Sequence, residues 1–176
     1  METFSASKAF CANPDFGLQR EKQLKALGAA EVDAPVVDII SALNSLPHCF
    51  TLQSCYGHFL YPGQEDPHNL EPLPARRGAA RVEYRIAYVA FCIDAGAPGR
   101  RLRDALGEIP TIDPEYIQFG SAEWFWERQV NSFALQVEPV RFKHQDKAVL
   151  GREEALRVER IRNVFFDRIR GLLRIR

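Results

Sequence analysis

Apolar residues in the first third of the chain recur at spacings of three and four, which is the period of an α-helix. This pattern predicts one helix over residues 16–27, with Gly28 following it as a C-cap. A second helix is expected to begin at Asp33, whose side chain suits an N-cap, and to end near Pro47. The apolar stripe of this second helix consists of Val36, Ile39, Ile40 and Leu43.

From residue 48 onward the period changes to two, the alternation typical of a β-strand. The alternation is clearest over residues 80–94. Shorter stretches of the same character predict strands over residues 48–53, 58–61, 116–120 and 131–140. Residues 62–79 interrupt this series as a long proline-rich loop, and a loop of this length in a compact domain is usually functional or mobile.

A short helix is expected over residues 100–106, after a turn over 96–99. A long amphipathic helix is expected over 146–173, with Gly151 as a candidate interruption. The order of elements favours mixed or antiparallel pairing over a doubly wound parallel sheet. We therefore predict a single compact α/β domain over residues 1–176, tending toward α+β. It should have two N-terminal helices, a mixed or antiparallel sheet and a long C-terminal helix.

The charges balance, because 23 lysines and arginines face 23 aspartates and glutamates and the formal net charge is zero. This balance excludes a generally basic protein that coats nucleic acid, although it allows a local basic patch. The chain starts without a secretory signal and contains no apolar run of the roughly 18 residues that span a bilayer. We expect a cytoplasmic protein that does not enter a membrane and whose four cysteines are free thiols.

Most of the soft and titratable side chains gather between residues 48 and 68, namely His48, Cys49, Cys55, His58 and His68. Two residues separate Cys55 from His58, so a zinc site with Cys49 and His68 as distant ligands is one interpretation. A structural zinc site normally brings two tight ligand pairs, and only one is present here, so no metal site is predicted. Cys49 is better explained as a small buried apolar residue. A metal-dependent hydrolase that uses Cys55, His58 and His68 stays open as an alternative.

A nucleophilic cysteine is a further interpretation of the same segment. Cys55 follows a strand in a turn where Gly57 allows the backbone to approach a ligand closely. Backbone N–H groups in such a turn bind anions and favour a thiolate. No acidic residue stands beside Cys55 in the sequence, so His58 is the residue available to move a proton. Cys55 and His58 are therefore the candidate catalytic residues.

Three adjacent aromatic residues, Trp124, Phe125 and Trp126, form a second feature. Adjacent aromatics usually fill a core or an interface, but they also provide a stacking surface for a nucleobase. Trp124 is for this reason a candidate ligand-binding residue. Arg76 and Arg77 follow the proline-rich loop, where they either meet phosphates or form a solvated rim. The glycine-rich dinucleotide fingerprint and the P-loop pattern are both absent from the sequence.

The segment from Val32 to Leu60 carries a pattern shared with a known family. Its matching residues are Val32, Asp33, Asn44, Phe50, Thr51, Ser54, Cys55 and Gly57. This pattern is similar to the tRNA wybutosine-synthesising methyltransferases. In that family a valine-aspartate pair opens a helix that ends in asparagine, and a phenylalanine-threonine strand runs into a serine-cysteine-serine-glycine-arginine turn. Tyr56 and His58 stand here in place of the second serine and the arginine, so the arginine's bidentate contact is lost.

The resemblance implies a compact α/β enzyme that uses S-adenosylmethionine to methylate a modified guanosine beside the anticodon of phenylalanine tRNA. It implies tRNA as a partner and a small adenosine- or nucleotide-like ligand at the turn over 54–58. The candidate ligand-binding residues are then Thr51, Ser54, Tyr56, Gly57 and Trp124. The alternative from another class is a non-catalytic interaction protein, in which the last helix and residues 124–126 form a homodimer or partner interface.

Overall fold

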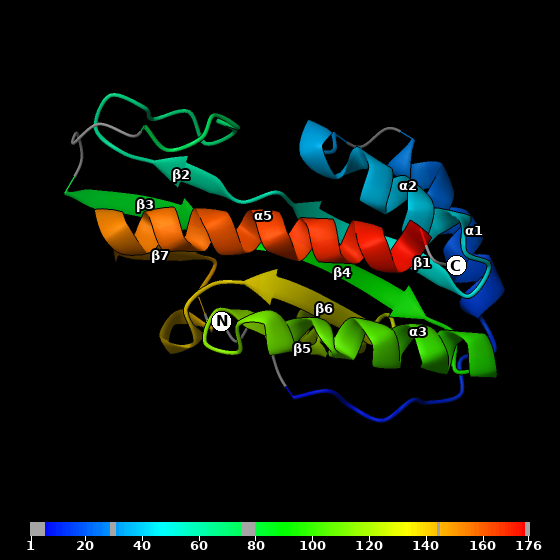
Figure 1. Cartoon of the computed structure of the whole chain (residues 1–176). Helices are drawn as coiled ribbons and strands as arrows, with labels where there is room; N and C mark the ends of the chain where they lie inside the picture. Colours follow the sequence, from blue (N-terminus) through cyan, green and yellow to red (C-terminus); the bar gives the residue numbers. More distant parts are fainter. Residues whose placement is uncertain (1–5, 29–30, 75–79, 144, 175–176) are drawn as a thin grey trace.

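The computed structural model describes residues 6–28, 31–74, 80–143 and 145–174 (Figure 1). The described residues form two antiparallel sheets covered by helices, and a long helix follows the last strand. This confirms the predicted α/β class, the antiparallel pairing, the two N-terminal helices and the long C-terminal helix. The four-stranded sheet has the order β1 (Cys49–Cys55), β4 (Ala87–Ile93), β6 (Ser132–Val137) and β5 (Ile117–Ser121). The three-stranded sheet has the order β2 (His58–Leu60), β3 (Arg81–Arg85) and β7 (Lys147–Gly151).

Two long stretches of chain connect these sheets. β1 continues into β2 after residues 56–57, and β3 continues into β4 after Ile86. The single strand predicted over 80–94 is therefore two strands in two sheets. The break falls at Ile86, whose N–H donates to the carbonyl oxygen of Asp146 rather than to the strand that pairs with β4.

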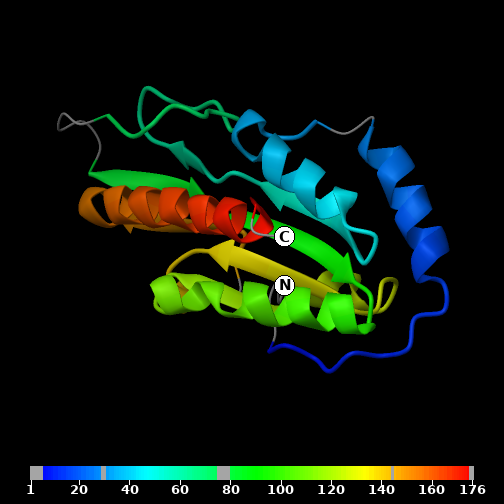
Figure 2. The same ribbon diagram turned by 45° about the vertical axis from the view of Figure 1, so that its right-hand side comes forward.

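The helices gather mainly on one face of the sheets. α5 (Arg152–Arg174) lies across both sheets, with α2 (Val37–Ser45) on one side of it and α3 (Ala97–Gly107) on the other (Figures 1 and 2). A 3₁₀ turn (Ala34–Val36) leads into α2. α1 (Phe16–Leu27) packs on β1, where Phe16 contacts Phe50 on the other face of the sheet.

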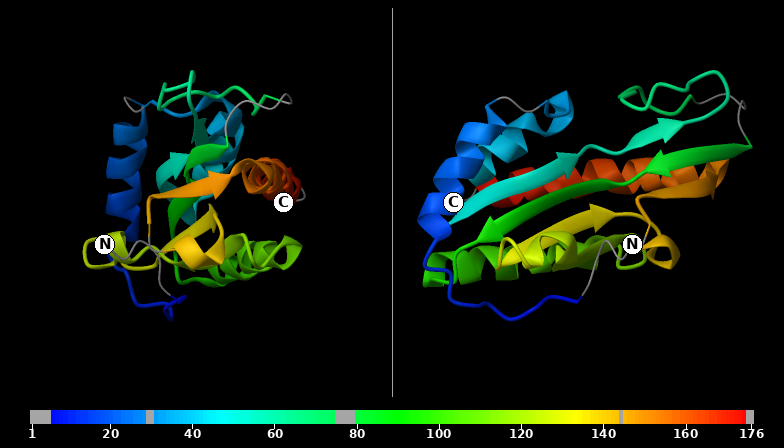
Figure 3. Two further views of the ribbon diagram at one scale, coloured as in Figure 1. Left: turned by 90° about the vertical axis from the view of Figure 1, so that its left-hand side faces the viewer. Right: turned by 180° about the vertical axis from the view of Figure 1, so that it is seen from behind.

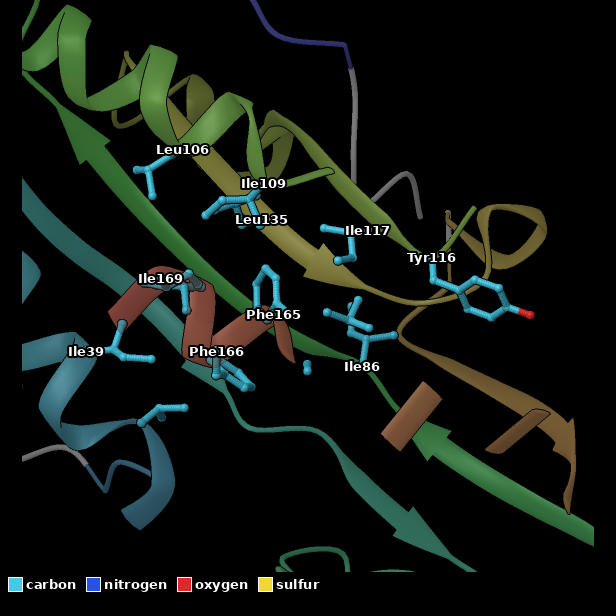
Figure 4. Close-up of a cluster of buried hydrophobic side chains, with 14 of the residues drawn as sticks. Ile39, Ile86, Leu106, Ile109, Tyr116, Ile117, Leu135, Phe165, Phe166 and Ile169 are labelled. Atoms are coloured by element: carbon cyan, nitrogen blue, oxygen red, sulfur yellow. The ribbon is translucent and has the colours of Figure 1, made fainter. Parts of the chain in front are cut away.

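The main core lies between α5 and the sheets. Phe165, Phe166 and Ile169 of α5 are buried against Ile39 of α2 and Leu135 of β6 (Figure 4). These α5 residues recur at helical spacing, while Asp167 and Arg168 between them are exposed. The apolar stripe of this amphipathic helix therefore packs against the sheets and α2 of the same chain.

Two predicted helix boundaries are wrong, each for a local reason. The last helix begins at Arg152 and not at residue 146, because residues 147–151 form β7. Ala148 and Leu150 are buried there while their neighbours are exposed, a period of two. α3 includes residues 97–99, predicted as a turn, since Pro98 fits the first turn of a helix and Gly99 lies tightly against the backbone of Asp94.

The remaining predicted elements are confirmed within a few residues. The helix over 16–27 matches α1, and the strands predicted over 48–53, 58–61, 116–120 and 131–140 correspond to β1, β2, β5 and β6. Residues 62–74 of the predicted proline-rich loop contain no helix or strand. Arg76 and Arg77 lie outside the described residues. A short helix, α4 (Glu123–Trp126), holds the aromatic triplet.

The face of the strands opposite α5 is covered less completely, and we call this surface the open face. Seen from behind, the strands lie in front of α5, and α1 covers one end of β1 (Figure 3). Ala90 and Ala134 are nevertheless fully buried on the open face, because Trp124 and Phe125 pack over them.

Candidate functional site

The turn over residues 54–58 lies where the chain passes from one sheet to the other. Gly57 adopts φ 90°, a backbone conformation that favours glycine. In a regular strand, residues three apart point to opposite faces. Here the glycine shifts this phase, so that Cys55 and His58 face the same side of the chain. The two candidate catalytic residues are therefore brought together by backbone geometry.

Tyr56 points the other way, toward α5. Its ring stacks on Phe166 at 5.3 Å between centroids, and its hydroxyl group donates to Asn163 Oδ1 at 3.0 Å. Arg162, which is also buried, lies over the Tyr56 ring at 4.0 Å and donates to the carbonyl oxygen of Gly57 at 2.8 Å. Tyr56 and Gly57 therefore fix the turn to α5.

His58 is buried and hydrogen-bonded through both ring nitrogens. Nδ1 lies 3.0 Å from the carbonyl oxygen of Asn69, and Nε2 lies 3.3 Å from Asp33 Oδ2. Both partners are acceptors, so both nitrogens carry a proton in the metal-free protein and the ring is an imidazolium. Hydrogen bonds to the side chains of Asp33 and Cys55 raise the pKa of His58 to about 10. The hydrogen bond from His58 lowers the pKa of Asp33.

Asp33 is the site residue to which the sequence pattern assigns another role. The pattern predicts that it caps the second helix, but its side chain caps nothing at that helix start. Its Oδ2 instead accepts the backbone N–H of Tyr56 at 2.7 Å and faces His58. The family resemblance likewise assigns Asp33 to the start of a helix, so the sequence carries no signal for its place beside His58.

Cys55 completes the group. Its sulfur accepts the backbone N–H of Gly57 at 3.4 Å. The donor atoms of Asp33, Cys55 and His58 all lie within 4.8 Å of one another. A cleft of about 550 Å³ opens beside them, and its walls include Ser54, His68 and Arg85 together with all three residues.

A second pocket, of about 450 Å³, meets the first at Cys55 and Arg85, which line both. Tyr88 and Trp124 supply its aromatic walls, and Gln53, Asp146 and Lys147 supply polar groups. This Tyr88–Trp124 pocket lies on the open face. The structure thus brings Trp124 and Cys55, which the sequence singles out separately, into one pocket.

A row of polar side chains crosses the open face beside this pocket. The strand register places Cys55 opposite Tyr88, Tyr88 opposite Gln136, and Gln136 opposite Gln118. Gln136 donates to Glu138 Oε1 at 2.7 Å, and both side chains are fully buried. Burial, followed by the charge of Asp146, raises the pKa of Glu138 to about 9, so this carboxyl group is neutral near pH 7.

Of the other predicted residues, Thr51 and Cys49 lie apart from the two pockets, whereas His68 lines one of them. Thr51 is buried and exchanges two hydrogen bonds of 2.8 Å with the Asn44 side chain. Cys49 is buried in the main core, as expected of a small apolar residue. His68 lines the cleft, with its ring 6.1 Å from that of His58. Sequence reasoning missed Tyr88 and Arg85, because a strand residue gains a site role only through its neighbours in the sheet.

Comparison with known proteins adds information on the fold only. No family model and no curated protein matches the chain. Two solved structures of the PH1069 protein from Pyrococcus horikoshii are similar, each at 14% sequence identity. One covers 92% of this chain and 93% of that chain with a TM-score of 0.52, and the other covers 91% of both with a TM-score of 0.48. At this identity the likeness concerns the fold alone. Among the described residues, no helix is both long and apolar enough to cross a membrane.

Proposed function

We propose that this protein binds an adenosine-containing ligand in the Tyr88–Trp124 pocket and acts as an S-adenosylmethionine-dependent methyltransferase on a modified nucleotide base. One observation carries the proposal. Cys55, in the turn that resembles the wybutosine methyltransferases, lines the same pocket as Trp124. Two independent sequence features therefore meet at one place.

The lining of this pocket suits S-adenosylmethionine chemically. The rings of Tyr88 and Trp124 offer stacking surfaces for adenine and favourable contacts for a sulfonium cation. Asp146 offers a carboxylate for ribose hydroxyl groups, and Lys147 offers a cation for the carboxylate of the ligand. The pocket volume falls in the range of small-molecule sites. When bound, this cofactor would supply an activated methyl group.

The methyl-accepting base belongs, in this proposal, to the neighbouring cleft. Arg85 lines both cavities, and an arginine there suits a phosphate group of a nucleotide. Ser54 and the backbone of the turn would hold polar groups of the base. The macromolecular partner implied by the resemblance is tRNA.

The fold buries part of the surface on which the alternative of a non-catalytic interaction protein rests. Phe165, Phe166 and Ile169 of α5 are buried in the core and Trp124 contributes to a pocket wall, whereas Val164 of α5 is exposed. The arrangement therefore favours a ligand-binding protein.

Thermal melts and calorimetry with S-adenosylmethionine, its demethylated product and adenosine test the proposal. A ligand at a hundred times its dissociation constant stabilises a protein by about 2.7 kcal/mol, so a rise in Tm is expected. Trp124→Ala should weaken binding about tenfold to a hundredfold, because stacking of a base is worth about 1–3 kcal/mol. Trp126→Ala is the matched control, since Trp126 packs against Phe133 and Lys8. Absence of binding by all three ligands would refute the proposal.

A further inference from the structure

The Asp33, Cys55 and His58 side chains offer three different donor atoms to one point. They are a carboxylate oxygen, a thiol sulfur and an imidazole nitrogen, mutually within 4.8 Å. His58 Nε2 and Asp33 Oδ2 are 3.3 Å apart. Two ligands of a tetrahedral zinc ion, each about 2.0–2.1 Å from the metal, are separated by about 3.4 Å. The measured separation thus fits two ligands of one ion.

Each of the three donors is also oriented by a backbone group. The N–H of Tyr56 donates to the Asp33 carboxylate, and the N–H of Gly57 donates to the Cys55 sulfur. His58 places Nδ1 against the carbonyl oxygen of Asn69, which leaves Nε2 pointing into the cluster. A metal-bound histidine typically donates its second ring N–H to a carbonyl or a carboxylate, and bound carboxylates are likewise hydrogen-bonded. The outer contacts of a metal site are therefore already in place.

The surroundings leave room for a further ligand. The three residues line the cleft of about 550 Å³, so the cluster is open on one side. Three protein ligands with an open position are the arrangement of catalytic rather than structural zinc sites. A thiolate and an imidazole favour zinc and its neighbours over magnesium or calcium, which prefer oxygen ligands.

We infer that Asp33, Cys55 and His58 bind a divalent zinc-class cation, with a fourth position open to water or to a ligand in the cleft. This inference goes beyond the proposed function, because Asp33 and His58 do not line the Tyr88–Trp124 pocket. The sequence alone suggests Cys55, His58 and His68 as a metal set. The structure places Asp33, and not His68, within reach of the other two donors. Binding requires a neutral ring and a thiolate, so it releases protons.

Cobalt(II) is the sharpest probe, because a cobalt–thiolate bond gives a charge-transfer absorption band and tetrahedral cobalt gives intense visible bands. The full chain is first treated with a chelator and then titrated with cobalt(II), and afterwards with zinc. We expect saturation at one equivalent per chain, a charge-transfer band, a rise in Tm and loss of the cobalt spectrum on adding zinc. If cobalt(II) produces neither a charge-transfer band nor a change in Tm in the wild-type protein, the inference is overturned.

Variants assign the ligands. Cys55→Ser should abolish the charge-transfer band, whereas Cys11→Ser, which removes an exposed cysteine, should leave it unchanged. Loss of an outer partner of a metal ligand costs about 10–100-fold in affinity, so His58→Gln and Asp33→Asn should cost at least as much. Circular dichroism and metal-free melts of each variant separate a lost ligand from a lost fold. A band that persists in Cys55→Ser would refute the assignment.

The two proposals fail in different ways. Trp124→Ala should lose affinity for S-adenosylmethionine and keep the cobalt spectrum. His58→Gln should lose the cobalt spectrum and keep at least part of the affinity for the adenosine ligand. If no adenosine ligand binds but the cobalt titration succeeds, the metal site stands while the proposed function falls.

Discussion

The two faces of the four-stranded sheet differ in the side chains that are buried on them. On the face toward α5, the buried side chains are mainly apolar. Arg162 is the one buried charged side chain among the described residues of this face, and it donates a hydrogen bond to the carbonyl oxygen of Gly57. On the open face, Gln136 donates hydrogen bonds to Glu138 and Gln118, while Gln136 Oε1 and Glu138 Oε2 have no hydrogen-bond partner among the described residues. Buried polar atoms without partners cost stability.

This difference separates folding from function. The α5 face supplies the burial that stabilises the chain. The open face retains polar groups that a core would exclude, and both pockets meet there at Cys55. Substitutions on the first face should therefore change stability, and substitutions on the second should change ligand binding or pH dependence.

Gly57→Ala tests the α5 face and should have the largest effect. A Cβ atom at this position would lie 2.8 Å from the Ala87 Cβ atom, in addition to the strain of φ 90°. We expect a loss of about 3–5 kcal/mol in the free energy of unfolding, measured in urea. Gly63→Ala is the matched control, because its φ is 91° and nothing lies within 4 Å of its Cβ position. It should cost only about 1–2 kcal/mol. Equal losses in the two variants would contradict the close packing of the turn.

Glu138→Gln tests the open face. The folded protein keeps the Glu138 proton up to a pKa of about 9, whereas the unfolded chain loses it near 4.5. The free energy of unfolding of the wild type should therefore decrease as the pH rises from 4.5 to about 9, by on the order of 1 kcal/mol per pH unit. Glutamine does not titrate, so the variant lacks this decrease. Its free energy of unfolding should match that of the wild type near pH 4.5 and exceed it near pH 9. Urea unfolding across the window measures the difference. Glu127→Gln, on the exposed surface, should follow the wild type throughout.

Asp33→Asn tests the link between the faces in the chelator-treated protein. Without the carboxylate, the pKa of His58 should fall from about 10 toward its ordinary value of 6.5, as nuclear magnetic resonance of the ring protons can measure. The stabilising contribution of the pair is complete below the unfolded pKa of histidine and above that of aspartate. It disappears as the pH rises through about 10 or falls through the lowered pKa of Asp33. An unchanged His58 pKa would show that Cys55 and Asn69 determine it without Asp33.

Thr51→Val should have the smallest effect. The variant removes the oxygen that accepts the Asn44 amide, so we expect a loss of about 1 kcal/mol. Affinity for the adenosine ligand should not change, because the Thr51 side chain faces α2. Thr111→Val is the control: it also removes a hydrogen bond, to the carbonyl oxygen of Glu108, but at an exposed position, so it should cost less stability and leave ligand affinity unchanged. If Thr51→Val loses ligand affinity, Thr51 contributes to ligand binding as the sequence predicts.

Local pattern is enough to predict most elements but not their partners. The helix over 16–27 and the alternation of β6 are properties of the residues themselves. The pattern also assigns the residues of β7 to the last helix, because Leu150 fits the apolar stripe of that helix. Pairing with β3 decides for the strand. The division at Ile86 likewise depends on a contact with Asp146.

The candidate site divides in the same way. Cys55 and His58 can be found from the sequence, since both stand in one short turn. Asp33 cannot be assigned to them by spacing, because residues 34–54 lie between Asp33 and Cys55 and the sequence context of Asp33 is that of a helix cap. Tyr88 reaches the pocket through its register with Cys55. Such cross-strand relations carry no mark in the linear sequence.

The hydrogen bond from Arg162 to Gly57 joins residues that are 105 positions apart. During synthesis the turn therefore leaves the ribosome long before its partner on α5 exists. Strands β1 and β2 can form earlier, but the turn between them acquires its final hydrogen bond only when residue 162 has emerged. The order of translation thus makes the Cys55–His58 turn one of the last parts of the molecule to become fixed.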